Sequence, residues 1–521
     1  FLGARIPTDF NAFLRIGTDG KVKLLTGKIE MGQGVITSLA QMLADELVLP
    51  LTSVKMVMGD TLLCPYDRGT FGSLSTPVFG VALRQAAAEA RAVLVQMAAE
   101  KLAVPPSQLK IKDGQIIDLK NPNQRVTYTQ LAGGKIIERR LKQTASPLPA
   151  SQHTISGKAT GRLDARQKVT GEARYSGDIR LPDMLYAAIL RPSAHDASLK
   201  SLDLAPAKKI KGVKIIQDGD LIAVLHHYPD EAQKALAKIN VEWEQPKPKI
   251  DNRTIFDHLL RSAPSAEVIS QIGDIETGRN LAAQKFEGTY LNHYVAHAPM
   301  ESHTAVAQVE GQKATVWAST QTPFWAQQEV ASTLGLTPQN VRVITPFVGG
   351  GFGGKTRNQQ VIEAARLAKL VGKPVQVAWS RAEEFFYDTF RPAAIVKIKS
   401  GLDSAGRITF WDYNVYFAGM RGSEQFYEIP HHREAVYGRW RGLAGGPRDH
   451  CRVVPVCRHD PKLKLAGAVR EKGDLLAVGR IDRKLIVARG RDESFGLSVS
   501  GCGRPGHSPD VPVRDPCVVG E

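Results

Sequence analysis

Two kinds of hydrophobic spacing run through the first part of the chain. Near the start, two runs that alternate apolar and polar residues flank Asp19 and Gly20, which predicts a β-hairpin closed by a tight turn. Apolar residues then recur at helical spacing over residues 35–49, and an alanine-rich version of the same pattern covers residues 80–102. We therefore expect a hairpin followed by two helices in this part of the chain.

The same patterns continue beyond a polar, proline-containing stretch near residues 143–155, which is typical of a linker. Short strands are expected around one helix between residues 157 and 250, and longer alternating strands return after residue 285. The expected strands cover 186–192, 212–217, 221–225, 239–244, 314–320, 340–347, 375–380 and 408–417, and the expected helices cover 230–239 and 359–372. The mixture predicts an α+β protein with several domains.

The last part of the chain, residues 433–521, differs from the rest in composition. It is rich in arginine, holds four of the five cysteines and shows no capped amphipathic helix. The cysteine spacing fits neither a disulfide framework nor a zinc site. We expect either a disordered basic extension or, preferably, a reading-frame change that replaced the native C-terminus. No catalytic role is expected for it.

Composition supports a folded chain and narrows the classes of partner. Of the 521 residues, 43% are hydrophobic and 23% are charged, which excludes a disordered, collagen-like or coiled-coil protein. No run reaches the roughly 18 apolar residues that a membrane span needs. The net charge of +16 would suggest nucleic acid, but the arginine preference lies in the tail, so we expect no nucleic-acid partner. The chain begins with Phe1, so a signal peptide or anchor ahead of it stays open.

The candidate chemistry lies in glycine-rich loops, and the richest covers residues 346–357. Three consecutive glycines, Gly349, Gly350 and Gly351, let the backbone approach a ligand and expose N–H groups that can bind an anion. The same stretch matches the P-loop pattern through Gly349–Thr356, so an NTPase is an alternative. The following strand lacks the terminal Asp that would hold magnesium, which weakens this alternative. A purely structural turn also stays open.

Two further loops share this character. In residues 30–47, Gly32 and Gly34 flank Gln33, and the helix that follows could offer free N–H groups to an anion. In residues 59–76, small hydroxyl residues surround two glycines and could bind a phosphate or a polar ring; they are Thr70, Ser73, Ser75 and Thr76. Asp67 and Arg68 beside this loop are expected in a solvated turn.

The histidines of residues 292–304 are interpreted as structural residues. His293 and His297 have the i, i+4 spacing of a helical metal pair, but Pro299 and β-branched neighbours disfavour a helix. We expect core or loop histidines, with Glu301 and His303 beside them, and no metal site.

Seven segments together resemble the molybdopterin-binding large subunit of the xanthine dehydrogenase and aldehyde oxidase family. They are EMGQG, GTFGSLST, KVTGEARYSGDI, HAPMESHTAVA, ASTQTP, GGGFGGK and WSRAEEFFYDTFRPA, and they span residues 30 to 393. Their order resembles the isoquinoline 1-oxidoreductase β subunit type. The resemblance covers about residues 10–432. It implies a molybdopterin-binding domain in two parts, 1–150 and 256–432, around an inserted α/β-hammerhead-like domain, 151–255.

The resemblance also implies roles for particular residues. Gln321 matches a glutamine near the metal's oxo group, and Phe352 matches the loop beside the metal; these are the candidate catalytic residues. The candidate cofactor-binding residues are Gly32, Gln33, Gly34, Gly72, Ser73, Ser75, Gly349, Gly350, Gly351 and Gly353. No protein metal ligand is implied, since the pterin dithiolene holds the molybdenum. The implied cofactor is molybdopterin in its cytosine dinucleotide form.

The implied activity is hydroxylation of an aldehyde or an N-heterocycle with water as the oxygen source. Electrons would pass to a small [2Fe–2S] subunit, because only Cys64 lies outside the tail and a cluster needs four cysteines. A cytochrome c subunit is a further candidate partner, and the implied location is periplasmic or membrane-associated, with the cytoplasm kept open.

Two departures from the family pattern limit this expectation. Thr356 stands where xanthine-type enzymes carry a purine-reading glutamate, so purines are a poor substrate. The family's catalytic glutamate comes from a C-terminal Gly-Glu motif, and only Glu521 matches it, which we interpret as coincidence. An inactive, truncated or frameshifted family member is therefore the alternative function.

Overall fold

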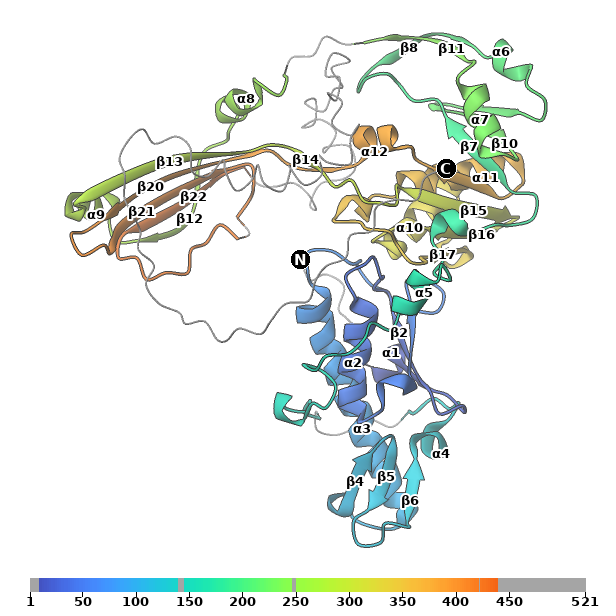
Figure 1. The fold of residues 1–521 in the computed structure, drawn as a ribbon, viewed down its shortest axis with the longest axis vertical. Helices are drawn as coiled ribbons and strands as arrows, with labels where there is room; N and C mark the ends of the chain where they lie inside the picture. The colour runs from blue at the N-terminus through green and yellow to red at the C-terminus, as the bar shows by residue number, and fades with distance from the viewer. Residues whose placement is uncertain (1–8, 139–144, 246–249, 421, 439–521) are drawn as a thin grey trace, which may run out of the picture. The chain divides into compact units, whose positions relative to one another are not determined.

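The computed structural model describes residues 9–138, 145–245, 250–420 and 422–438, and Figure 1 shows how their helices and strands follow one another. The predicted tail begins at residue 433, so all but its first six residues lie outside the described part.

The N-terminal residues form a small sheet and two helices that pack on each other. Strands β1 (Leu14–Ile16) and β2 (Val22–Thr26) make the predicted antiparallel hairpin, and Gly20 takes a φ of 76° in its turn. Helix α2 (Val35–Leu47) then leads to β3 (Val54–Met58), which pairs with β2 in parallel. The alanine-rich helix α3 (Val81–Leu102) packs on α2. The hairpin and both helices agree with the prediction from hydrophobic spacing.

A second small sheet follows α3 and was not predicted. Its antiparallel strands, β4 (Leu109–Lys112), β5 (Gln115–Asp118) and β6 (Arg125–Thr127), are too short to show a clear alternation. Helix α4 (Tyr128–Ala132) closes the sheet with a capping box between Thr127 and Gln130. The Tyr128 hydroxyl donates to the carbonyl of Leu47 over 2.8 Å, which ties this sheet to the end of α2.

The largest sheet has seven strands in the order β17-β16-β15-β18-β7-β10-β9. Its strands are β7 (Leu185–Ile189), β9 (Lys214–Asp218), β10 (Leu221–His226), β15 (Thr304–Glu310), β16 (Lys313–Ala318), β17 (Val341–Ile344) and β18 (Val375–Ala378). Helices α10 (Pro323–Leu334) and α11 (Gln359–Val371) pack on the β15–β18 side, and α7 (Pro229–Leu236) packs on β7 and β10. One hydrophobic core, which includes Val316, Val343 and Val361, lies between the sheet and helices α10 and α11, and a separate cluster with Val224 and Ala235 lies at α7.

This sheet crosses the domain boundary that the sequence suggested. Strands β7, β9 and β10 come from residues 151–255, yet β7 pairs in parallel with β18, with Leu185 opposite Val375. The predicted domain boundaries therefore remain a proposal.

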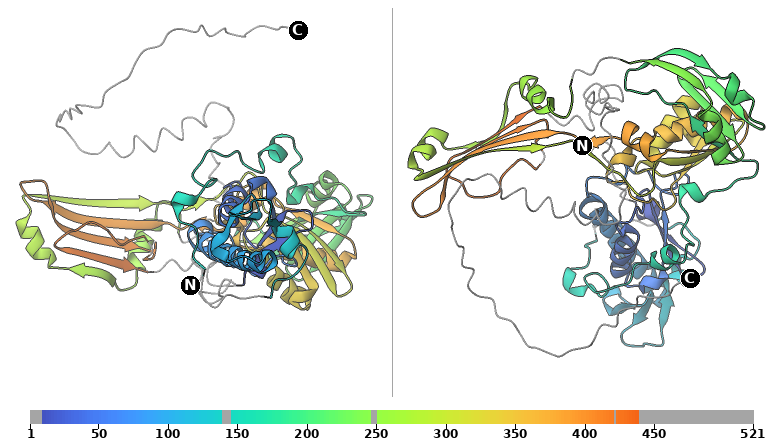
Figure 2. Two further views of the ribbon diagram at one scale, coloured as in Figure 1. Left: turned by 90° about the horizontal axis from the view of Figure 1, so that it is seen from below. Right: turned by 45° about the horizontal axis from the view of Figure 1, so that its top comes forward.

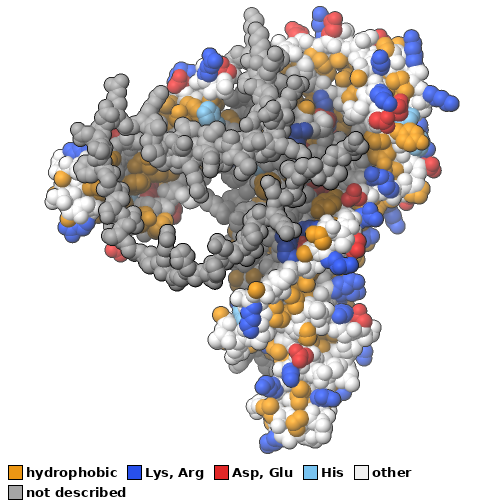
Figure 3. Space-filling view, in the orientation of Figure 1, with side chains coloured by type: hydrophobic (Ala, Val, Ile, Leu, Met, Phe, Trp, Pro, Cys, Tyr) orange, Lys and Arg blue, Asp and Glu red, His pale blue; other side chains and the backbone are white. Residues whose placement is uncertain are grey.

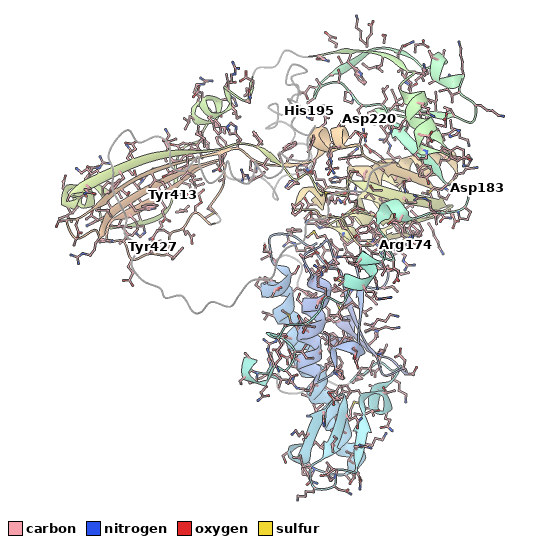
Figure 4. The ribbon with its side chains drawn as sticks, in the orientation of Figure 1. Arg174, Asp183, His195, Asp220, Tyr413 and Tyr427 are labelled. Atoms are coloured by element: carbon pink, nitrogen blue, oxygen red, sulfur yellow. The ribbon has the colours of Figure 1, made fainter. Side chains whose placement is uncertain are left out.

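A five-stranded sheet, in the order β12-β22-β21-β20-β13, is the third large element. Its strands are β12 (Glu267–Ile272), β13 (Gln284–Asn292), β20 (Ala394–Leu402), β21 (Ile408–Tyr416) and β22 (His432–Tyr437). Both views in Figure 2 show these strands side by side. Figure 4 labels Tyr413 on β21 and Tyr427 in the connection to β22. Because β22 runs to Tyr437, the sheet continues five residues beyond the boundary expected after residue 432.

The remaining elements are short. They are α1 (Phe10–Phe13), α5 (Ala165–Val169), β8 (Ser198–Asp203), α6 (Ala205–Lys208), β11 (Asn240–Glu244), α8 (Ile255–Arg261), α9 (Ile275–Leu281), β14 (Val295–Ala296), α12 (Arg381–Tyr387) and β19 (Phe390–Arg391). None of the described helices combines the length and the apolar composition needed to cross a bilayer. On the face shown in Figure 3, basic and acidic side chains of the described residues are interspersed.

Cys64 is the only cysteine among the described residues. It is buried, and its thiol donates to the carbonyl of Val57 over 3.4 Å. Burial raises the pKa of this thiol to about 11.

Candidate functional site

The loop after β17, residues 349–355, needs its glycines for two different reasons. Gly350 and Gly353 have φ angles of 93° and 108°, which L-residues with side chains rarely adopt. Gly349 and Gly351 instead have no room, because an added Cβ would lie 2.5 Å from the Glu301 Cβ and 2.6 Å from the Gln321 Oε1 respectively. Phe352 takes a left-handed φ of 53° and leaves 72% of its surface exposed.

Gln321 lies at the centre of the site and connects two of the loops. It follows β16 and is 1% exposed. Its side-chain Nε2 donates to the carbonyl of Thr70 over 2.7 Å, and its Oε1 accepts from the backbone N–H of Gly353 over 3.0 Å. Its own backbone N–H donates to the carbonyl of Lys355 over 2.7 Å. One buried amide thus holds the 59–76 loop and the 349–355 loop together.

Thr70 extends this connection to the third loop. Its backbone N–H donates to the carbonyl of Gln321 over 2.9 Å, and its Oγ1 accepts from the N–H of Ile29 over 3.0 Å. The N–H of Val348 donates to the carbonyl of Glu30 over 3.1 Å. The three glycine-rich loops, up to about 320 residues apart in sequence, therefore meet at one place.

The predicted site residues take different positions around this meeting point. Gln321, Gly351 and Gly353 are in direct contact. The exposed residues Gly72 and Ser73 follow Thr70, and Ser73 has a left-handed φ of 58°. Ser75 begins the short π-helix Ser75–Gly80 that leads into α3.

The start of α2 differs from the expectation of a free anion site. The carboxylate of Glu30 accepts from the N–H groups of Gly32, Gly34 and Ile36 over 2.9 to 3.0 Å. Arg162 donates to the same carboxylate over 3.1 Å and to the carbonyl of Gly32 over 2.8 Å. The chain's own carboxylate therefore occupies the helix N-terminus, where an external anion was expected.

Gln33 uses its amide within the turn. Its Oε1 accepts from the N–H of Met31 over 2.7 Å, and its Nε2 donates to the carbonyl of Ile29 over 3.0 Å. Gly32 lies beside it with a φ of 107°, and no atom lies within 4 Å of the position a Cβ would take. The turn therefore presents open backbone at Gly32.

The geometry of Lys355 argues against a P-loop. A P-loop lysine must reach phosphate, but Lys355 is 0% exposed and its Nζ is 2.8 Å from the Oε2 of Glu301. The Thr356 hydroxyl, which would bind magnesium, donates to the carbonyl of Gly353.

Two of the histidines lie where they were expected, His303 in the core and His297 in a loop. His303 is buried against Glu384 at 2.9 Å, and His297 is 3.1 Å from the Oδ2 of Asp388. Burial works to lower the pKa of His297, but the hydrogen bond and charge of Asp388 outweigh it and raise the pKa. No group of three or more His, Cys, Asp or Glu side chains within the described ranges could hold a metal ion.

The expectation of a solvated turn at Asp67 is wrong. Asp67 is 9% exposed, because its Oδ1 is 2.8 Å from the Nζ of Lys28 and also accepts from the N–H of Gly69. The ion pair between the buried Lys28 ammonium and the Asp67 carboxylate therefore stabilises the 59–76 loop.

Sequence analysis also missed three supporting residues, Glu30, Arg162 and Asp388. Glu30 stands directly before the glycine turn, and a carboxylate there could have been recognised as a helix cap. Arg162 and Asp388 carry no such local signal, since they reach the loops from distant segments, Arg162 at the carbonyl of Gly32 and Asp388 beside Gly354. Arg174, labelled in Figure 4, belongs to the KVTGEARYSGDI segment, and its carbonyl accepts from the N–H of Phe347 over 3.1 Å.

Comparisons with known proteins agree with this arrangement. Residues 3–170 and 261–425 each match a family model described as a molybdopterin cofactor-binding domain. The chain is 30% identical over 291 residues to the nicotinate dehydrogenase large molybdopterin subunit of Eubacterium barkeri, covering 49% of this chain and 68% of the relative.

Two longer alignments cover more of this chain. It is 29% identical over 416 residues to a nicotinate dehydrogenase subunit of Pseudomonas putida, covering 78% of this chain and 35% of the relative. It is 26% identical over 447 residues to the β-type subunit of isoquinoline 1-oxidoreductase from Brevundimonas diminuta, covering 75% of this chain and 57% of the relative. The chain therefore spans about a third and somewhat more than half of the lengths of these two proteins.

Proposed function

Because this chain belongs to the molybdopterin-binding large subunits of the xanthine dehydrogenase and aldehyde oxidase family, we propose that it binds a molybdopterin cofactor where its three glycine-rich loops meet. The observation that carries the proposal is the Gln321 side chain, which connects the 59–76 loop to the 349–355 loop through two hydrogen bonds.

The residues present fit such a cofactor in their chemistry. They offer open backbone at Gly32, a neutral buried amide at Gln321 and the exposed ring of Phe352. No group of three or more His, Cys, Asp or Glu side chains that could hold a metal ion lies among the residues that the structure describes. This donor set suits a cofactor that brings its own metal ligands.

Each candidate residue has a task in this proposal. The Gln321 amide carries a second N–H that can donate to the cofactor, because only one of its two N–H groups faces the carbonyl of Thr70. The Gly32–Gly34 turn can approach the pterin closely, and Phe352 can cover the side from which substrate enters. When bound, the cofactor would supply the redox chemistry that adds oxygen from water to a substrate carbon.

The substrate class that we propose is an aldehyde or an N-heterocycle. Two relatives are named for nicotinate and isoquinoline, which are N-heterocycles. We propose that purines are not substrates. The chain carries Thr356 rather than a glutamate at the position that reads a purine, and the Thr356 hydroxyl donates to the carbonyl of Gly353.

The partners and finer cofactor identity belong to the same proposal. We propose the cytosine dinucleotide form of the cofactor, a small [2Fe–2S] subunit as electron acceptor, a cytochrome c subunit that receives the electrons next, and a periplasmic or membrane-associated location. Sustained turnover that requires an added iron–sulfur protein would support the electron route. Glu521, the residue that matches the family's C-terminal Gly-Glu motif and that we interpret as a coincidence, lies outside the described residues.

Cofactor content tests the site directly. The purified chain should contain about one molybdenum per chain and release a pterin fluorophore on denaturation. Gly351→Ala should lower the molybdenum content at least tenfold, because the new Cβ would lie 2.6 Å from the Gln321 Oε1. The matched control is Gly161→Ala, whose new Cβ meets no atom within 4 Å. Equal molybdenum in both variants, or none in the unmodified chain, would contradict the proposal.

A further inference from the structure

The buried ion pair between Lys355 and Glu301 holds the 349–355 loop, and the proposed function gives it no role. Lys355 is fully buried, and its Nζ is 2.8 Å from the Oε2 of Glu301. Burial lowers the pKa of Lys355 below its ordinary value, although the carboxylates of Glu301, Glu384 and Asp388 favour the charged form. Burying a charged amine costs free energy, so we expect the buried Lys355 to contribute to the structure of this loop.

Glu301 binds both ends of the loop through a single oxygen atom. Its Oε2 accepts from the backbone N–H of Gly349 over 2.8 Å and from the Nζ of Lys355 over 2.8 Å. The backbone of Glu301 adds a third contact, because its N–H donates to the carbonyl of Gly349 over 3.0 Å. The first and last residues of the loop are therefore held at a fixed separation by a side chain that lies 48 residues or more before them.

The middle of the loop faces Gln321. The N–H of Gly353 donates to the Gln321 Oε1, and the Gln321 N–H donates to the carbonyl of Lys355. Any change in the separation of the loop ends must move Gly353 and Lys355, and thus the amide that they hold. Phe352, with its left-handed backbone, would move with them.

We propose that Lys355 and Glu301 are positioning residues, and that their ion pair sets the span of the 349–355 loop and so the placement of Phe352 and the Gln321 amide toward the cofactor. The effect on the cofactor rests on the proposed function, whereas the effect on the loop does not. Lys355 acts through the loop backbone and touches neither cofactor nor substrate.

The first experiment uses the full chain without cofactor, so that its outcome is independent of the proposed function. Hydrogen–deuterium exchange is followed in peptides covering residues 349–355. In Lys355→Met these amides should exchange at least tenfold faster than in the unmodified chain, while peptides from α3 stay unchanged. The matched control is Lys313→Met, which removes an exposed lysine from β16. Unchanged exchange in the loop of a folded Lys355→Met variant would overturn the proposal.

Two further variants keep the test decisive if Lys355→Met does not fold. Glu301→Gln retains an acceptor for Gly349 but removes the charge. The double variant Lys355→Met with Glu301→Gln leaves no unpaired buried charge, so it should fold better than Lys355→Met and still exchange rapidly in the loop. Protection equal to that of the unmodified chain in both variants would refute a role for the ion pair.

The second experiment measures the cofactor environment. In loaded protein, Glu301→Gln should change the electron paramagnetic resonance signal of Mo(V), and Lys313→Met should not. An unmodified chain that contains no molybdenum would defeat the proposed function, while the exchange experiment would still decide the role of the ion pair. A loaded Glu301→Gln variant with an unaltered signal would overturn the proposed effect on the cofactor.

Discussion

At the scale of single residues, the site depends on side chains that form hydrogen bonds with backbone groups. The Gln321 amide, the Thr70 hydroxyl and the Glu30 carboxylate each hold backbone groups of another loop or of a neighbouring turn. Buried backbone N–H and carbonyl groups need partners, and irregular loops cannot supply them from a regular ladder. Polar side chains at these positions therefore stabilise a shape that secondary structure alone would not give.

His297 should make stability depend on pH. Its pKa is raised in the folded chain by Asp388, so protonated His297 stabilises the fold below its unfolded pKa, and this contribution is lost as pH rises through the folded pKa. The loss in melting temperature caused by His297→Gln should be larger at about pH 5.5 than at about pH 9. The charge of Glu384 also raises the pKa of His297, and the charges of Asp388 and Glu384 act on Lys355 as well.

Melting temperatures of both proteins at the two pH values check this prediction. The exposed His227, changed to Gln, serves as the control and should show a similar, small effect at each pH. A His297→Gln effect that grew towards alkaline pH would contradict the role of Asp388.

At the scale of elements, α2 begins in a carboxylate cap rather than in a ligand site. Glu30→Ala would leave the N–H groups of Gly32, Gly34 and Ile36 without their acceptor and remove the partner of Arg162. Since Arg162 is 39% exposed, solvent compensates part of the loss, and we expect a cost of about 2 kcal/mol in the free energy of unfolding.

Denaturant unfolding measures this cost. Glu172→Ala, at an exposed position, should change the unfolding free energy by less than about 0.5 kcal/mol. An equal effect of the two substitutions would show that the cap contributes nothing.

At the scale of the whole molecule, sequence patterns predicted long elements better than their connections. Helices α2, α3 and α11 and strands such as β16 and β21 have enough residues to show their period, and all lie where expected. Strands β4–β6 are too short for this. The start of α12 was not predicted, although the capping box between Ser380 and Glu383 is visible in the sequence.

The candidate site was predictable only in part, because residues from distant segments form no local sequence pattern. Glycines that need a positive φ or a close approach can be suspected from their runs, as at Gly350 and Gly351. The residues that hold them, such as Glu301 and Arg162, come from distant segments and have no local pattern. Their roles required the tertiary contacts.

The shared seven-stranded sheet gives a prediction for residues 151–255. Expressed alone, this segment should not fold cooperatively, because the edge of β7 that pairs with β18 would lose its partner. A nuclear magnetic resonance spectrum of the isolated segment should show poor amide dispersion. Well-dispersed signals would instead support an independent inserted domain.

The burial of Cys64 has a practical consequence for labelling. A thiol with a pKa of about 11 and little exposed surface is almost entirely uncharged at neutral pH and reacts slowly with maleimides and spin labels. Once the four cysteines beyond residue 438 are replaced, a cysteine introduced at Met300, which is 92% exposed next to Glu301, would be the main reactive position. A paramagnetic probe attached there would report distances to a Mo(V) centre. Among the described residues, only the buried Cys64 could also take up the label.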